Sequence, residues 1–180
     1  MTSMSIGSED AGRVAGPIPS EPGSVAYDFT NSLSELLTGL RTLWDSASRR
    51  DNETSRRLFQ EFRRKLFRHM AWEENVLFPA FERRCSFSGL RRVADMFVEH
   101  VGVEALIDQL NTDLNRNFSS SPEVRSSIDL ILKRLEETLR EYRDRVSCDV
   151  YRPLDTLLDR PGSFLTRKEI LRGWREPGQT

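Results

Sequence analysis

Two histidine–glutamate pairs are the side chains of this sequence whose type and spacing could do chemistry. His69 precedes Glu73 by four residues, His100 precedes Glu104 by four, and the chain contains no other histidine. Residues four apart lie on the same face of a helix, one turn from each other. Both pairs fall on apolar stripes, where a charged glutamate is costly unless it is paired or binds a metal. Two such pairs can place four ligands around one interior point.

Two interpretations of these four residues are open from the residues alone. Imidazole suits iron, zinc, copper and nickel, carboxylates suit harder ions such as manganese, and a mixture of the two inside a helical bundle is typical of iron or manganese. Alternatively, an inward histidine is a hydrogen-bonded core residue, and an inward glutamate pairs with an arginine or with the histidine itself. The four side chains would then form a polar network in the core.

Four amphipathic helices must position these side chains. Apolar residues recur with a helical period over residues 25–48, about 52–78, 90–114 and 122–150, and no alternating strand pattern competes. Asn52 or Thr54 can cap the second helix and Pro79 ends or kinks it, while Ser121 caps the fourth with Pro122 at its first position. Short loops between helices of similar length predict an all-α, up-down-up-down four-helix bundle.

The ends of the chain differ in composition from this bundle. Residues 1–23 are rich in Gly, Ser and Pro and poor in large apolar groups, which predicts a disordered tail. The bundle itself is expected to span residues 24–155. Residues 156–180 form a C-terminal extension in which LTRKEILRGW can fold as a short helix.

Composition excludes several classes of function. The 27 Lys and Arg residues nearly balance the 28 Asp and Glu residues without a basic stripe, so no nucleic-acid partner is expected. No apolar run approaches the ~18–20 residues of a membrane span, and the N-terminus has no signal-peptide pattern. Cys85 and Cys148 form no CxxC motif, which indicates a reducing, cytoplasmic environment. No phosphate-binding loop and no catalytic triad is visible, so no catalytic residue is predicted.

Two stretches resemble the hemerythrin-like (HHE cation-binding) domain family. LFRHMAWEENVLFPAFE is similar to its most recognisable segment, and ADMFVEHVGVEALIDQL is similar to its Met-x-x-Glu-His helix. The resemblance covers about residues 25–155 and implies a four-helix bundle with a carboxylate-bridged, non-haem di-iron centre. It implies that His69 and His100 are iron ligands and that Glu73 is a bridging carboxylate. Glu104 stands where some members place a second histidine of that helix.

The sequence departs from the family pattern on the first and fourth helices. Thr30 or Leu33 occupies the position of the expected first-helix histidine, and Tyr142 and Val146 face the positions of the expected fourth-helix histidine and acid. A register shifted by one residue does not restore these ligands. Tyr142 could add a phenolate to the site, or it could donate a hydrogen bond to one of the two inward glutamates.

The predicted function follows from this reduced ligand set. We expect a hemerythrin-like protein that holds non-haem iron, mono- or dinuclear, at His69, Glu73, His100 and Glu104. Its role would be to bind or sense oxygen, nitric oxide or iron. The alternative is a metal-free interaction or regulatory module that has kept the bundle and lost the centre. An enzyme acting on peroxide or nitric oxide ranks last, because too few ligands are visible.

Overall fold

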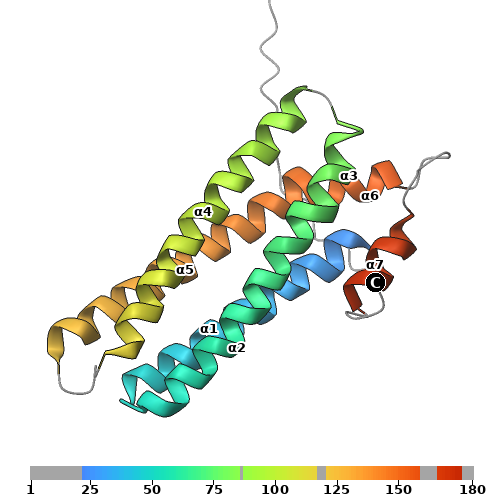
Figure 1. Cartoon of the computed structure of the whole chain (residues 1–180). Coiled ribbons are helices and arrows are strands. Elements are labelled where there is room, and N and C mark those ends of the chain that lie inside the picture. The colour runs from blue at the N-terminus through green and yellow to red at the C-terminus, as the bar shows by residue number, and fades with distance from the viewer. Residues whose placement is uncertain (1–21, 86, 117–120, 159–165, 176–180) are drawn as a thin grey trace, which may run out of the picture.

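The computed structural model describes residues 22–85, 87–116, 121–158 and 166–175, and within these ranges the chain is helical with no strand (Figure 1). The predicted disordered tail falls almost entirely outside the described residues. The elements are α1 (Val25–Ser48), α2 (Asn52–Trp72), η1 (Glu73–Leu77), α3 (Phe78–Glu82), α4 (Phe87–Asn115), α5 (Pro122–Val146), η2 (Ser147–Tyr151), α6 (Arg152–Leu158) and α7 (Arg167–Arg175).

Helix starts are fixed by side chains that accept orphan backbone N–H groups. Ser121 accepts from the backbone of the residue three positions on, with Pro122 in the first turn of α5, as predicted. The cap of α2 was predicted wrongly. Asp51 fills it by accepting from the backbone N–H of Thr54 at 3.0 Å, so Asn52 and Thr54 both lie inside the helix.

Two π-helical segments interrupt otherwise continuous helices. The second helix does not end at Pro79, because η1 leads directly into α3, where proline occupies the first turn and its missing N–H costs little. The fourth helix likewise continues past residue 150, through η2 into α6. Each π turn takes up one more residue than an α turn, so it changes which side chains face the core beyond it.

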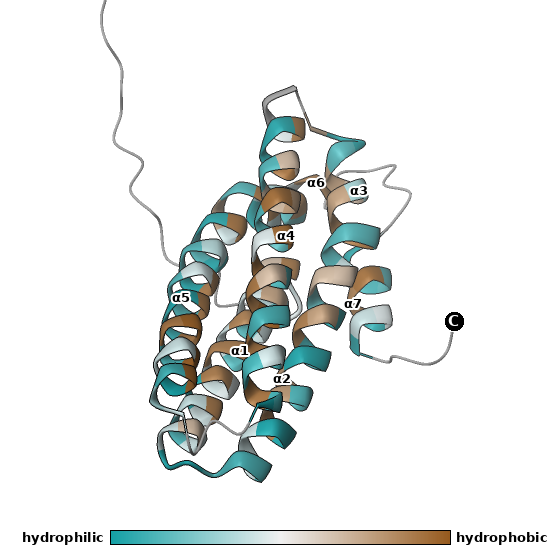
Figure 2. Ribbon diagram, turned by 60° about the vertical axis from the view of Figure 1, so that its left-hand side comes forward, coloured by the Kyte–Doolittle hydropathy of each residue, from teal (hydrophilic) through white to brown (hydrophobic). Residues whose placement is uncertain are grey.

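The helices pack so that their apolar stripes share one core. α1 lies against α2 and α5, and α4 lies against α2 and α5 (Figure 1). In Figure 2 teal and brown alternate along the long helices, as expected for amphipathic helices that turn one face to the core. Large side chains that are almost fully buried fill the core, among them Phe29, Leu33, Phe59, Leu66, Leu77, Phe78, Met96, Ile107 and Tyr151.

The C-terminal elements close one end of this assembly. The Asp155 carboxylate on α6 accepts the backbone N–H groups of Val25 and Ala26, both at 2.9 Å, and lies 3.0 Å from Nε of Arg167. The start of α1 is thereby joined to α6 and α7. The predicted short helix in the extension is confirmed as α7. No helix in the described ranges combines the length and apolarity that a bilayer crossing requires.

Candidate metal centre

A buried glutamate forms the middle of the polar cluster inside the bundle. Glu73, the first residue of η1, has no exposed surface. Tyr142 donates its hydroxyl to Oε1 of Glu73 at 2.7 Å, and Tyr151 donates to the same oxygen. Nε2 of His100 lies 3.1 Å from Oε2, and Nε2 of His69 lies 3.6 Å from Oε1. We call these five residues the Glu73 cluster.

The same atoms also contact one another around the carboxylate. Nε2 of His100 is 2.9 Å from the hydroxyl of Tyr142, and Nε2 of His69 is 3.2 Å from the hydroxyl of Tyr151. Both imidazoles therefore turn Nε2 towards one interior region. The two phenol oxygens and the two carboxylate oxygens complete a set of six donor atoms there.

Residues outside the cluster hold the two imidazoles in this orientation. The hydroxyl of Ser32 on α1 lies 3.0 Å from Nδ1 of His69, and Oε1 of Glu74 lies 2.7 Å from Nδ1 of His100. Histidines that bind metals commonly have their second ring nitrogen fixed in this way, which sets the tautomer and the ring orientation. The arrangement is therefore suited to presenting both Nε2 atoms to an ion.

Glu73 is an anion at neutral pH. Burial raises its pKa, but the charge of His69 and hydrogen bonds from His100 and His69 lower it by more, to about 2. Burial likewise lowers the pKa of His100, but hydrogen bonds to Glu73 and Glu74 and the charges of both carboxylates raise it above its ordinary value. A protonated His100 between two glutamates partly balances the buried charge.

The two tyrosines are neutral hydrogen-bond donors in this arrangement. Burial and the adjacent Glu73 carboxylate raise the pKa of Tyr142 and of Tyr151 well above the ordinary phenol value. Both hydroxyls therefore keep their protons and direct them at the carboxylate. The expectation that Tyr142 hydrogen-bonds to an inward glutamate is confirmed.

Glu104 does not belong to this cluster. The structure brings His69, Glu73 and His100 together, but the side chain of Glu104 is exposed on α4, so its predicted inward orientation was wrong. The buried face of α4 runs through His100, Val103 and Ile107. Because each residue turns an α-helix by about 100°, Val103 takes the core position and Glu104 is rotated towards solvent.

Tyr151 was missed from the sequence. It is the last residue of η2, fully buried, and nine positions beyond Tyr142. Nine residues advance a regular α-helix by about 900°, which places the two ends on opposite faces. The extra residue taken up by the π turn brings Tyr151 round towards the cluster, and no periodic pattern in the sequence signals that turn.

Aromatic side chains enclose the cluster on two sides. Phe29 and Trp174, whose ring centroids are 4.6 Å apart, lie 5.5 Å and 5.8 Å from the His69 ring. Phe78 stacks on the His100 ring at 5.8 Å. Trp174 belongs to α7, so the C-terminal extension supplies part of the wall that separates His69 from water.

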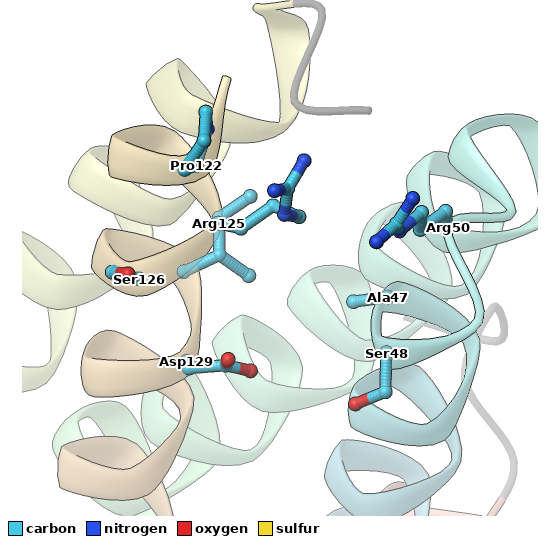
Figure 3. A pocket seen from close by; sticks show the side chains of 8 residues that line it. Ala47, Ser48, Arg50, Pro122, Arg125, Ser126 and Asp129 are labelled. Carbon is cyan, nitrogen blue, oxygen red and sulfur yellow. The ribbon is translucent and has the colours of Figure 1, made fainter. Parts of the chain in front are cut away.

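A surface pocket lies away from the Glu73 cluster. Figure 3 shows a pocket of about 330 Å³ between the end of α1 and the start of α5, where Arg50 and Arg125 extend their side chains towards each other. No residue of the Glu73 cluster lines it, so this pocket is separate from the candidate centre. No group of three or more His, Cys, Asp and Glu side chains that could hold a metal is found among the described residues.

Comparison with known proteins gives a match to a protein-family model. The family model described as the hemerythrin HHE cation binding domain matches residues 31–148. Neither a curated protein nor a solved structure matches the chain. Tyr151 and Trp174 both lie beyond the matched residues.

Proposed function

Because the chain belongs to the hemerythrin HHE cation-binding family, we propose that it binds non-haem iron through the Glu73 cluster. The proposed ligands are His69, Glu73, His100, Tyr142 and Tyr151. Two phenol oxygens thus replace the carboxylate of Glu104 in the ligand set predicted from the sequence. The up-down-up-down topology of a four-helix bundle is part of the same proposal.

The observation that supports iron is the convergence of six donor atoms on one buried region. Contacts among these donors measure 2.7, 2.9, 3.1 and 3.2 Å. Donors held about 2.0–2.2 Å from a shared octahedral ion lie about 3 Å apart, so the spacing already present suits a metal shell. His, Cys, Asp and Glu side chains alone give no such group among the described residues, so the phenols of the tyrosines are essential to the proposal.

The charge of the donor set favours the ferric ion. Glu73 supplies one negative charge, and iron binding would release the phenol protons of Tyr142 and Tyr151, so that three negative charges would neutralise Fe³⁺ in this buried site. Imidazole suits iron, and carboxylate and phenolate are hard ligands. Bound there, iron would supply a Lewis-acidic and redox-active centre, at which a small ligand such as dioxygen or nitric oxide would displace one of the six protein donors.

The side chains of this protein have distinct tasks in the proposed centre. Glu73 would provide the central carboxylate of the site. Ser32 and Glu74 orient the imidazoles through their Nδ1 atoms. Phe29 and Trp174 exclude water on the His69 side. Binding or sensing of the small ligand, rather than turnover, is the role that this enclosed arrangement supports.

One observation favours the second candidate, a metal-free interaction or regulatory module. Within the described residues, no buried side-chain nitrogen or oxygen atom of the Glu73 cluster lacks a hydrogen-bond partner. A fully satisfied polar network is stable without an ion. In this alternative the cluster specifies the packing of the core and the metal is lost.

Iron content measured together with visible absorption separates the two candidates. The chain is loaded with Fe²⁺ without oxygen, exposed to air and desalted, and we expect about one or two iron atoms per chain with a phenolate-to-iron charge-transfer band. Tyr142→Phe and Tyr151→Phe should each shift or weaken that band, whereas Glu104→Gln should not. Less than about 0.1 iron per chain, no more than in His69→Ala/His100→Ala, would establish the metal-free alternative.

A further inference from the structure

The outer face of α4 is unusually apolar for a solvent-facing helix. Of the five large hydrophobic side chains exposed in the described part of the chain, four lie on α4. Leu90 is 43% exposed, Phe97 40%, Val98 72% and Val101 66%. Contiguous apolar patches of this kind mark interaction surfaces more often than single exposed residues do.

A stripe of exposed residues runs along this outer face, apart from the stripe of α4 that faces the core. Its positions alternate in steps of three and four, which is the spacing that lets one helix pack along another. All six side chains at these positions are exposed. In chain order they are Arg91, Ala94, Val98, Val101, Ala105 and Asp108. We call this set the α4 outer seam.

The α4 outer seam is complementary to itself. From the centre of the seam towards either end, the order is valine, alanine and a charged residue. The charged residue is Arg91 at one end and Asp108 at the other. In an antiparallel pair, Val98 of one copy would meet Val101 of the second, and Arg91 would meet Asp108. A parallel pair would instead bring identical charges together, so opposite charges select the antiparallel arrangement.

Gly102, which is exposed beside the seam, leaves room for another helix to come close to the backbone of α4. Glycine inside a helix costs about 1 kcal/mol relative to alanine. A Cβ at Gly39, Gly89 or Gly173 would touch a neighbouring side chain, and Gly23 has a φ of +99°. A Cβ at Gly102 would meet nothing within 4 Å, so the single chain offers no reason for this glycine.

The charged ends of the seam are available for such a contact. Neither Arg91 nor Asp108 has an ion-pair partner among the described residues. Neighbouring charges of α4 are already used inside the chain, because Arg92 lies 3.5 Å from Asp149 and Glu99 pairs with Arg145.

We propose that the α4 outer seam is a two-fold interface at which two copies of this chain pack their α4 helices antiparallel. From Arg91 to Asp108 the seam is about 26 Å long at 1.5 Å per residue. A single helix pair of that length buries less area than a standard interface, so we expect the dimer to be weak and reversible. This interface is independent of iron, because no residue of the seam belongs to the Glu73 cluster.

Sedimentation of the full chain over a range of concentrations tests the interface. The wild-type chain should shift from monomer to dimer with increasing concentration, and Val98→Glu/Val101→Glu should stay monomeric with unchanged helical circular dichroism. Leu130→Glu is the matched control, because Leu130 is 58% exposed on α5 and lies off the seam, so it should dimerise as wild type does.

Charge reversal tests the direction of the helices. Arg91→Glu and Asp108→Arg should each weaken dimerisation at least about tenfold, because each turns two symmetric ion pairs into repulsions. A mixture of these two variants should form a heterodimer, and the double variant Arg91→Glu/Asp108→Arg should recover self-association. A wild-type chain that remains monomeric at about 1 mM overturns the proposal. Dimers that survive the valine substitutions, or weaken equally in Leu130→Glu, also overturn it.

Discussion

Removing the hydroxyl of Tyr151 tests whether the Glu73 cluster supports the core. Tyr151→Phe keeps the ring in its fully buried site and deletes the donor to Oε1 of Glu73 and the partner of Nε2 of His69. A hydrogen bond to a charged group contributes about 1.5–3 kcal/mol, and the buried carboxylate cannot replace it with water. We therefore expect the metal-free variant to lose about 1.5–3 kcal/mol of unfolding free energy.

Tyr142→Phe should cost a similar amount, and the two substitutions should not be additive. Both hydroxyls donate to the same carboxylate oxygen, so each remaining donor compensates in part for loss of the other. In the double variant Oε1 keeps only the 3.6 Å contact with His69. The double variant should therefore lose more stability than the sum of the two single losses.

Guanidinium unfolding of chelator-treated protein measures these free energies, with the slope of unfolding expected to stay constant. The thermal midpoint should fall by roughly 3–12 °C for each single variant. Tyr27→Phe is the matched control, since Tyr27 is the remaining tyrosine and is partly exposed. If Tyr151→Phe lies within about 0.5 kcal/mol of wild type, the hydroxyl is not bonded to Glu73 and the cluster has been described wrongly.

Three further substitutions test other parts of the structure. Glu104→Gln should change the unfolding free energy by less than about 0.5 kcal/mol because the side chain is exposed, and a larger loss would place it in the core. Asp155→Ala should cost about 2–4 kcal/mol in chemical unfolding, because two backbone N–H groups at the start of α1 lose their acceptor. Gly173→Ala should lower stability by about 1–2 kcal/mol and alter tryptophan emission, because its Cβ would lie 2.9 Å from the Trp72 ring; a gain in stability would show that α7 does not pack there.

The apolar periodicity of the sequence was sufficient to predict where the helices lie. The predicted first helix agrees with α1 at both ends, and the short helix of the C-terminal extension is present as α7. Such patterns succeed because burial of a continuous stripe decides where a helix forms. The effect of Pro79 was harder to predict, because a proline ends a helix only when no local change of geometry absorbs its missing N–H. The π turns next to Pro79 and Pro153 make that change.

The candidate site was predictable only where the helices are regular. His69 and Glu73 sit one turn apart on a helix that remains α-helical up to Glu73, so their convergence followed from spacing. The prediction for Glu104 failed because two neighbouring positions competed for one place in the core. Val103 occupies that place, because it buries apolar surface at no electrostatic cost. Tyr151 was not identified from the sequence because its orientation depends on the π turn η2, which the apolar periodicity does not reveal.

The tyrosines change the charge of the proposed centre as well as the number of side chains that could bind an ion there. A site built only from imidazoles and carboxylates brings buried charge together and depends on an ion to neutralise it. In the Glu73 cluster the phenol protons of Tyr142 and Tyr151 already lie against the carboxylate, and His100 adds a proton between Glu73 and Glu74. These protons supply positive charge next to the carboxylate, where a metal ion would otherwise supply it. The bundle is therefore expected to fold before any ion arrives, and removal of iron should empty the centre without unfolding the helices.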